Sequence, residues 1–157
     1  MPILTGLFGA TAGLLWAWLT GRIARLDGWW AGLDHGGWNP GDGVLAVIWL
    51  IVHGIAGVGV VAATGLAASS GRTTVLVLVG LTAAIEWLWL ARMFGGQDLR
   101  NGFTLVCVAW VTAAMASAGL IALSGWEGWL LIPLLVALTG YGTVTFVVWQ
   151  VNAPSRH

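Results

Sequence analysis

The stretch VLAVIWLIV, residues 44–52, decides the fold, because it is apolar at both odd and even positions. A membrane β-strand alternates apolar and polar side chains, whereas a helix in a bilayer is apolar along its length and satisfies its own backbone hydrogen bonds. The run LLIPLLV at residues 130–136 has the same character. We therefore expect an all-α integral membrane protein rather than a barrel.

Five segments are apolar and long enough to cross a bilayer, which takes about 20 helical residues. They are residues 3–21, 44–69, 74–93, 103–123 and 129–151. The chain is 59% hydrophobic and 8% charged, against about 25% charged residues in an ordinary soluble domain. We therefore expect residues 1–157 to form a single transmembrane domain. Six arginines balance six acidic residues, so no basic stripe indicates nucleic-acid binding.

The first connection, residues 22–43, is long, whereas residues 70–73 and 124–128 form short connections. Loops longer than the join requires are usually lids or binding loops. With five helices, this loop shares a side with the third connection and the C-terminus. That side carries Arg22, Arg25, Arg92, Arg100 and Arg156, and the opposite side carries Arg72. The positive-inside rule predicts a cytoplasmic C-terminus and an N-terminus outside.

Glu86 lies in the middle of the third segment, within AIEWLW at residues 84–89. A carboxyl group at this depth costs about 2.5–3.5 kcal/mol on insertion scales, so it should face the bundle interior in its neutral form. It could bind a polar ligand, act as a general acid, or hydrogen-bond to His53 or a hydroxyl of another helix. Trp89 lies three residues further on, on the same helical face.

His53 stands in the second segment, one turn after Trp49. A single histidine on an apolar helix is more often a satisfied core residue than a metal or haem ligand. The other histidines are His35 and His157, and the lone Cys107 lies in an apolar run. We therefore predict no metal site and no required cofactor.

Nine of the twelve tryptophans fall into two groups. Those near the segment ends suit the membrane interface, where an indole is favoured. They are Trp29, Trp30, Trp126 and Trp129. The others lie deeper or beside a proline turn, where aromatic faces can wall a cavity for a flat hydrophobic ligand. They are Trp38, Trp49, Trp87, Trp89 and Trp149.

The loop sequence WWAGLDHGGWNP, residues 29–40, followed by Trp49, resembles the TspO/MBR family of tryptophan-rich sensory and translocator proteins. That family has five transmembrane helices and a long first loop of the form Trp-Tyr-x-x-Leu-x-Lys-Pro-x-Trp-x-Pro-Pro. Trp89 with Phe94-Gly95 is similar to its Trp-x-Pro-x-Phe-Phe-Gly stretch. The chain departs from the family at His35-Gly36, which stands for Lys-Pro, and at Glu86, which stands for a helix-three asparagine.

The resemblance implies a membrane receptor or transporter-like protein that binds a planar hydrophobic ligand, such as a porphyrin, haem or a sterol. The cavity is expected between the first, second, third and fifth helices, beneath the long loop. The ligand-binding residues that we predict are Trp38, Asn39, Pro40, Trp49, His53, Glu86, Trp89 and Phe94.

A second hypothesis is a membrane-embedded cyclase or isomerase acting on a prenyl-derived lipid. Glu86 would be its general acid in an aromatic pocket, and Asp34 or Asp42 would supply a second carboxyl group from the loop. Small residues at Gly9/Gly13 and Ala114/Ala118 allow close helix contacts, and the resembled family commonly forms dimers. A homodimer is therefore also expected, with membrane lipids as the other partners.

Overall fold

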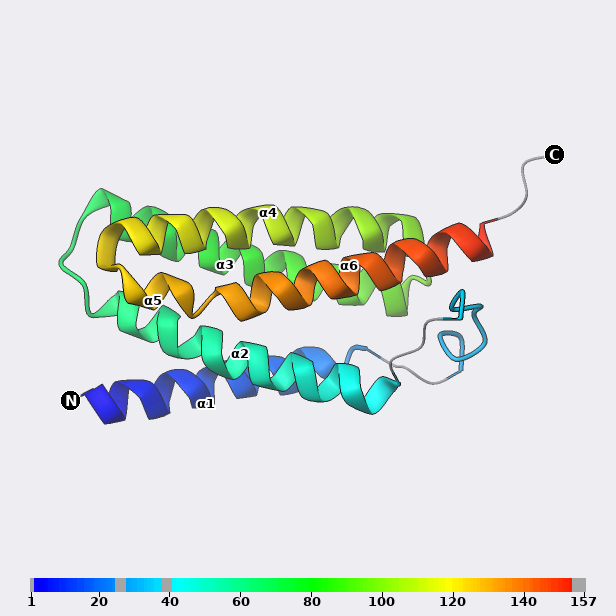
Figure 1. Cartoon of the computed structure of the whole chain (residues 1–157), viewed down its shortest axis with the longest axis horizontal. Helices are drawn as coiled ribbons and strands as arrows, with labels where there is room; N and C mark the ends of the chain where they lie inside the picture. The colour runs from blue at the N-terminus through cyan, green and yellow to red at the C-terminus, as the bar shows by residue number, and fades with distance from the viewer. Residues whose placement is uncertain (1, 25–27, 38–40, 154–157) are drawn as a thin grey trace.

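The computed structural model of the chain describes residues 2–24, 28–37 and 41–153, and all regular secondary structure within these ranges is helical. The elements are α1 (Pro2–Gly21), α2 (Asp42–Thr64), α3 (Ser70–Leu90), the π-helical turn η1 (Ala91–Gly95), α4 (Leu99–Ser124), the short α5 (Trp126–Trp129) and α6 (Ile132–Asn152). The long helices run side by side along one axis, and the two termini lie at opposite ends (Figure 1).

Five helical stretches of the described chain are long and apolar enough to span a membrane. They are Ile3–Gly21, Gly43–Thr64, Ser70–Gly95, Leu99–Ser124 and Trp126–Asn152. The predicted all-α architecture with five spans is confirmed, and the chain is an integral membrane protein.

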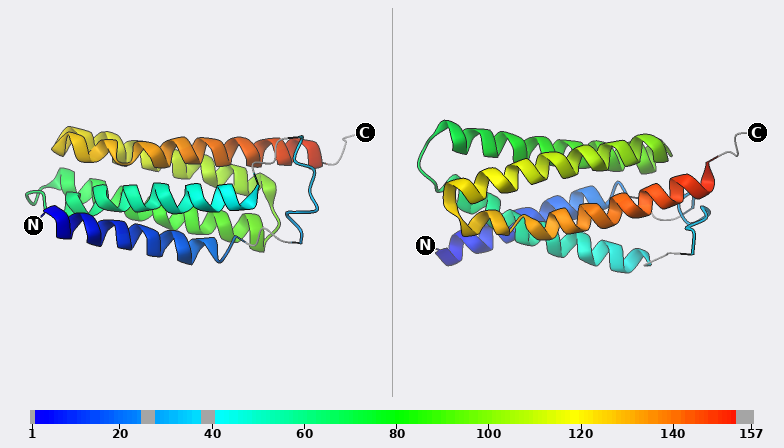
Figure 2. Two further views of the ribbon diagram at one scale, coloured as in Figure 1. Left: turned by 60° about the horizontal axis from the view of Figure 1, so that its bottom comes forward. Right: turned by 45° about the horizontal axis from the view of Figure 1, so that its top comes forward.

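The helices are arranged in the order α1, α2, α6, α4, α3 around the bundle (Figure 2). Along the chain, α1 and α2 make one hairpin and α3 and α4 make a second. Helix α6 packs between the two hairpins, against α4 and α2. The first loop, the turn between η1 and α4, and the C-terminal end of α6 share one end of the bundle (Figure 1). Described arginines of the predicted cytoplasmic side, Arg22, Arg92 and Arg100, belong to this end. Which side of the membrane it faces stays a prediction.

The α1–α2 hairpin is held by glycines on both helices. A side chain on Gly9 would meet the backbone of Gly57 and Val58, and one on Gly13 would overlap the carbonyl group of His53. Glycine allows this close approach because it has no Cβ. Gly9 and Gly13 were considered from the sequence as a possible dimer contact. In the structure they pack against α2 of the same chain.

The connection between α2 and α3 differs from the prediction. We expected the second segment to continue to residue 69 and the third to begin at residue 74, but α2 ends at Thr64 and α3 begins at Ser70. The Arg72 guanidinium donates hydrogen bonds to the carbonyl groups of Thr64 and Leu66, and the hydroxyl of Ser69 accepts from the Arg72 N–H. These contacts end one helix and cap the next, which apolar character alone does not show.

The last two spans also begin earlier than residues 103 and 129. Asp98 caps α4, and its carboxylate accepts from the backbone and side chain of Asn101, which lowers the pKa of Asp98. The short connection predicted over residues 124–128 is mostly helical, because α5 follows Gly125 directly. Pro133 lacks an N–H and is favoured in the first turn of a helix, so the chain breaks after Trp129 and α6 starts at Ile132.

The glycine contacts predict the effect of a single methyl group. Gly13→Ala should destabilise the protein by about 1–3 kcal/mol, because its Cβ has no room against α2. Gly6→Ala, on the same helix with nothing within 4 Å of its Cβ, should be neutral or stabilising by up to about 1 kcal/mol, since alanine is the better helix former. Thermal unfolding in detergent micelles measures both variants. Equal melting temperatures would show that the α1–α2 contact is not as close as described.

Candidate functional site

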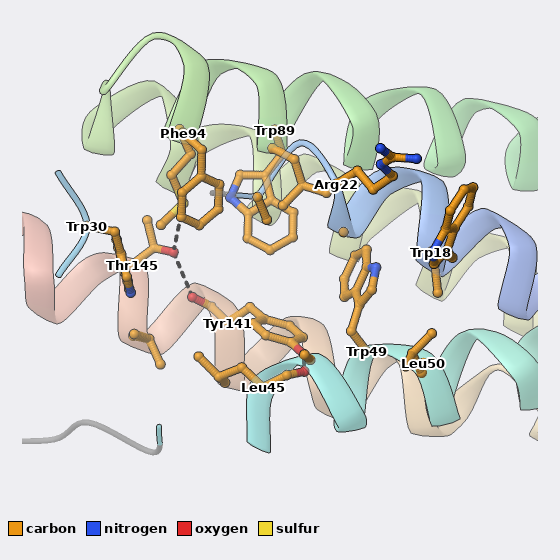
Figure 3. Close-up of a pocket in the computed structure, with 17 residues that line it drawn as sticks. Trp18, Arg22, Trp30, Leu45, Trp49, Leu50, Trp89, Phe94, Tyr141 and Thr145 are labelled. Atoms are coloured by element: carbon orange, nitrogen blue, oxygen red, sulfur yellow. Dashed lines mark hydrogen bonds between the residues drawn. The ribbon is translucent and has the colours of Figure 1, made fainter. Parts of the chain in front are cut away.

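A cavity lies toward the loop end of the bundle, bordered by α1, α2, the end of α3, η1 and α6 (Figure 3). Its volume is about 280 Å³. Its lining is mainly aliphatic and aromatic and comprises Ala17, Trp18, Gly21, Arg22, Ala24, Trp30, Leu45, Ala46, Trp49, Leu50, Trp89, Leu90, Met93, Phe94, Tyr141, Val144 and Thr145. We call this space the aromatic cavity.

Three aromatic rings from three helices form one wall of the aromatic cavity. The ring centroid of Trp49 lies 5.4 Å from that of Tyr141 and 5.8 Å from that of Trp89, and Trp89 and Tyr141 are also 5.8 Å apart. The Trp49 indole N–H donates to the hydroxyl of Thr20, and the Tyr141 hydroxyl donates to the Leu45 carbonyl group. These hydrogen bonds fix the rings of α2 and α6, so the wall is formed before any ligand arrives.

The first loop closes the end of the aromatic cavity with Trp30, which is only 3% exposed. Its ring contacts Phe94 at 5.5 Å and His35 at 5.0 Å between centroids. The loop is attached to α6, because the Asn152 side chain accepts from the Asp34 N–H and donates to the Asp34 carbonyl group. The long connection therefore covers this cavity, as its length suggested.

Two residues that line the aromatic cavity carry polar groups without a hydrogen-bond partner or at the surface. The indole Nε1 of Trp89 is buried and has no hydrogen-bond partner among the described residues. Such a donor is costly to leave unpaired. Arg22 is exposed and lines the cavity, with its guanidinium 5.0 Å from the ring centre of Trp18. The site thus offers a donor inside and a cation at its opening.

Glu86 lies deeper in the bundle and joins three helices. Its Oε2 is 3.2 Å from Nε2 of His53 on α2 and accepts from the Trp16 indole N–H on α1 at 3.3 Å. Glu86 and His53 are 2% and 5% exposed. Glu86 therefore lies in the bundle interior, as expected, and His53 is the partner that it contacts among the alternatives that the sequence left open.

The hydrogen bonds of this cluster determine how many protons it holds. The Trp49 carbonyl group can only accept, so the Nδ1 of His53 donates to it at 2.8 Å. Between Nε2 of His53 and Oε2 of Glu86 there must then be one proton, because two lone pairs facing each other at 3.2 Å would repel. Whichever atom holds that proton, the pair is neutral overall.

Glu86 and His53 line a second cavity of about 210 Å³. Its other lining residues are Ala12, Gly13, Trp16, Ala56, Gly57, Val60, Val61, Val79, Thr82, Ala83, Leu131 and Leu134. No residue lines both cavities. The contact between the Trp49 and His53 rings, 4.0 Å between centroids, lies between them.

The predicted ligand-binding residues therefore separate into three groups. Trp49, Trp89 and Phe94 line the aromatic cavity, whereas His53 and Glu86 line the second. Trp38, Asn39 and Pro40 lie outside the described residues.

Asp34, one of the two candidates for the second carboxyl group of the enzyme hypothesis, is not brought to Glu86. Its carboxylate accepts from the Gly36 N–H in the loop beside the end of α6, whereas Glu86 contacts α1 and α2.

Several cavity residues were not predicted from the sequence, among them three aromatic ones. Trp30 was expected at the membrane interface, but the loop folds it inward. Tyr141 and Trp16 were not selected, although Tyr141 is the only tyrosine in the chain and its hydroxyl needs a partner within an apolar helix. That single polar ring was a usable signal, whereas Trp16 was one of twelve tryptophans.

Five spanning helices around an aromatic cavity, closed by a tryptophan-bearing loop, define a helical membrane protein with an internal cavity. The chain belongs to the TspO/MBR family, and the sequence model of that family matches residues 4–150. It is 25% identical over 133 residues to the tryptophan-rich sensory protein of Cereibacter sphaeroides, covering 85% of this chain and 82% of that one. It is 22% identical over 134 residues to Protein CrtK of Rhodobacter capsulatus, covering 85% and 84%. The resemblance seen in the sequence is confirmed.

The Glu86–His53 pair predicts a measurable coupling. His53→Ala should cost about 3 kcal/mol of unfolding free energy in the wild type, because Glu86 loses a buried partner. In a Glu86→Ala background the same change should cost about 1–3 kcal/mol less. Thr82→Val is the matched control, since Thr82 lines the same cavity but bonds to Thr112, so its effect should add to that of His53→Ala. Unfolding in bicelles gives these values, and additivity for His53 and Glu86 would contradict the bond.

Proposed function

We propose that this protein is a membrane receptor or transporter-like protein that binds a planar hydrophobic ligand, such as a porphyrin, haem or a sterol, in the aromatic cavity. The observation that carries this proposal is the unpaired, buried Nε1–H of Trp89 among aromatic walls. An apolar pocket with a few fixed polar groups is the usual form of a small-molecule site. The ligand would stack on the rings and accept a hydrogen bond from Trp89.

The size of the aromatic cavity favours partial enclosure of the ligand. Its volume of about 280 Å³ is just below the range of about 300–1,000 Å³ that is typical of small-molecule pockets. A macrocycle would therefore place one edge among the rings and leave the other at the opening, where Arg22 lies. A guanidinium there suits a carboxylate-bearing ligand, so a porphyrin or haem fits the charges better than a sterol does.

The relatives support a receptor rather than a catalyst. One of them is called a tryptophan-rich sensory protein, a name that describes sensing. The enzyme alternative required Glu86 beside the aromatic rings and a loop carboxyl near it. The described residues place Glu86 in the second cavity and Asp34 beside α6, so no observation favours that alternative.

The proposal includes the assembly and orientation that the sequence predicts. The end with the long loop would face the cytoplasm, according to the positive-inside rule. A homodimer would use helix faces other than Gly9 and Gly13, which already contact α2. Gly80 on α3 has nothing within 4 Å of its Cβ position, so that face has room for a second copy. Cysteine crosslinking in bilayers tests the homodimer.

Binding of protoporphyrin to the protein in nanodiscs, followed by tryptophan fluorescence quenching, tests the ligand proposal. Trp89→Phe keeps an aromatic wall but removes the N–H, so it should weaken binding about 2–10-fold. Trp87→Phe is the control, because Trp87 is on the same helix but half exposed and outside the cavity lining. Trp49→Ala should weaken binding further. Non-saturable quenching, or unchanged affinity in Trp49→Ala and Trp89→Phe, would contradict the proposal.

Arg22 predicts a charge preference. Arg22→Gln should weaken protoporphyrin binding about 3–10-fold, because a charge-assisted hydrogen bond to a propionate is lost. Binding of the protoporphyrin dimethyl ester, which has no carboxylate, should not change. The same titration measures both ligands. An equal loss for acid and ester would show that Arg22 acts only through packing on Trp18.

A further inference from the structure

The second cavity has no part in the function proposed above, yet it contains the most deeply buried acid of the described chain. We propose that it is a separate binding site for a neutral, lipid-soluble alcohol, whose hydroxyl group donates a hydrogen bond to Oε1 of Glu86.

One carboxyl oxygen of Glu86 has no hydrogen-bond partner among the described residues. The Oε2 of Glu86 is engaged by both His53 and Trp16, whereas Oε1 is the buried oxygen without a described partner. Buried carboxyl oxygens are nearly always paired, because water no longer solvates them. Glu86 lines the second cavity and not the aromatic one, so we place the partner of Oε1 in the second cavity.

The hydrogen bonds of Glu86 require a ligand that donates a hydrogen bond and is uncharged. The shared proton lies between Oε2 and the Nε2 of His53, so Oε1 is an acceptor whether Glu86 is ionised or neutral. The ligand must therefore donate. Because the pair is neutral overall, a cationic amine would bring an uncompensated charge into the bilayer, which is costly. A hydroxyl group donates without adding charge.

A ligand would enter the second cavity from the bilayer. Ala12 and Trp16 of α1 face Val79 and Ala83 of α3 across the cavity, and none of the four is fully buried. All four lie inside membrane spans, so the rim faces lipid hydrocarbon rather than water. Small side chains and valines form much of the lining, and this favours a slender chain over a broad ring system. A long-chain alcohol dissolved in the bilayer meets these requirements.

Photolabelling of the full chain in phosphatidylcholine nanodiscs tests the proposal. A dodecanol with a diazirine near its hydroxyl group should label residues of the second cavity, mapped by mass spectrometry. Unlabelled 1-dodecanol should compete at a concentration about tenfold lower than dodecyl methyl ether, which accepts but cannot donate. It should also compete better than dodecylamine. Equal competition by the ether, stronger competition by the amine, or labelling elsewhere only would overturn the proposal.

Variants separate the hydrogen bond from the cavity. Glu86→Gln can donate to the Nε2 of His53 and keep an acceptor for the ligand, so labelling should stay within about twofold. Glu86→Leu has no acceptor and should lose about tenfold. Equal labelling of these two variants would overturn the role of Oε1.

A cavity-filling pair keeps the test valid if Glu86→Leu does not fold. Ala83→Phe fills the cavity and should reduce labelling at least about tenfold, whereas Ala84→Phe, on the exposed neighbouring position, should change it less than about twofold. Protoporphyrin quenching in Ala83→Phe should match that of the wild type, because the aromatic cavity shares none of these residues. Equal labelling of both variants would overturn the site, whatever the result with protoporphyrin.

Discussion

The hydrogen bond between Glu86 and His53 is the interaction on which the arrangement of this bundle depends. The α1–α2 hairpin is close-packed through Gly13 and Gly57, and α4 packs against α3 and α6, but α1 and α3 make little direct contact. The Glu86 carboxyl group bridges this gap, since it contacts both His53 of α2 and Trp16 of α1. The spaces on either side of the bridge are the two cavities.

A buried polar bridge of this kind determines where the helices lie relative to one another more than it raises the free energy of unfolding. Burying a carboxyl group and an imidazole requires their desolvation, and a well-packed apolar contact would often be as stable. Its advantage is that it fixes the distance of α3 from α1 and α2, because α1 and α3 make little direct contact. His53 then orients the neighbouring wall, because its Nδ1 donates to the Trp49 carbonyl group and its ring lies against the Trp49 ring. The bridge and the aromatic cavity are therefore connected through one residue.

The sequence predicts the spans well because the bilayer requires long apolar helices, and it predicts the interior position of Glu86 because lipid excludes a carboxyl group. It fails at the helix ends, where the Arg72 and Asp98 hydrogen bonds decide the boundaries. It also placed Glu86 and Trp89 in a single site, since they share a helical face. One turn along α3 is enough to put them in different cavities, because the Trp49–His53 contact on α2 lies between.

The position of the shared proton tests the bridge most directly. Solid-state NMR of the ¹⁵N,¹³C-labelled protein in bilayers at pH 7 can detect contact between the imidazole nitrogens of His53 and the carboxyl carbon of Glu86. We predict a protonated Nδ1, a correlation between Nε2 and the Glu86 carboxyl carbon, and one proton between the two side chains. An ionised Glu86 beside a His53 without a proton on Nε2, or the absence of any correlation, would contradict the bridge.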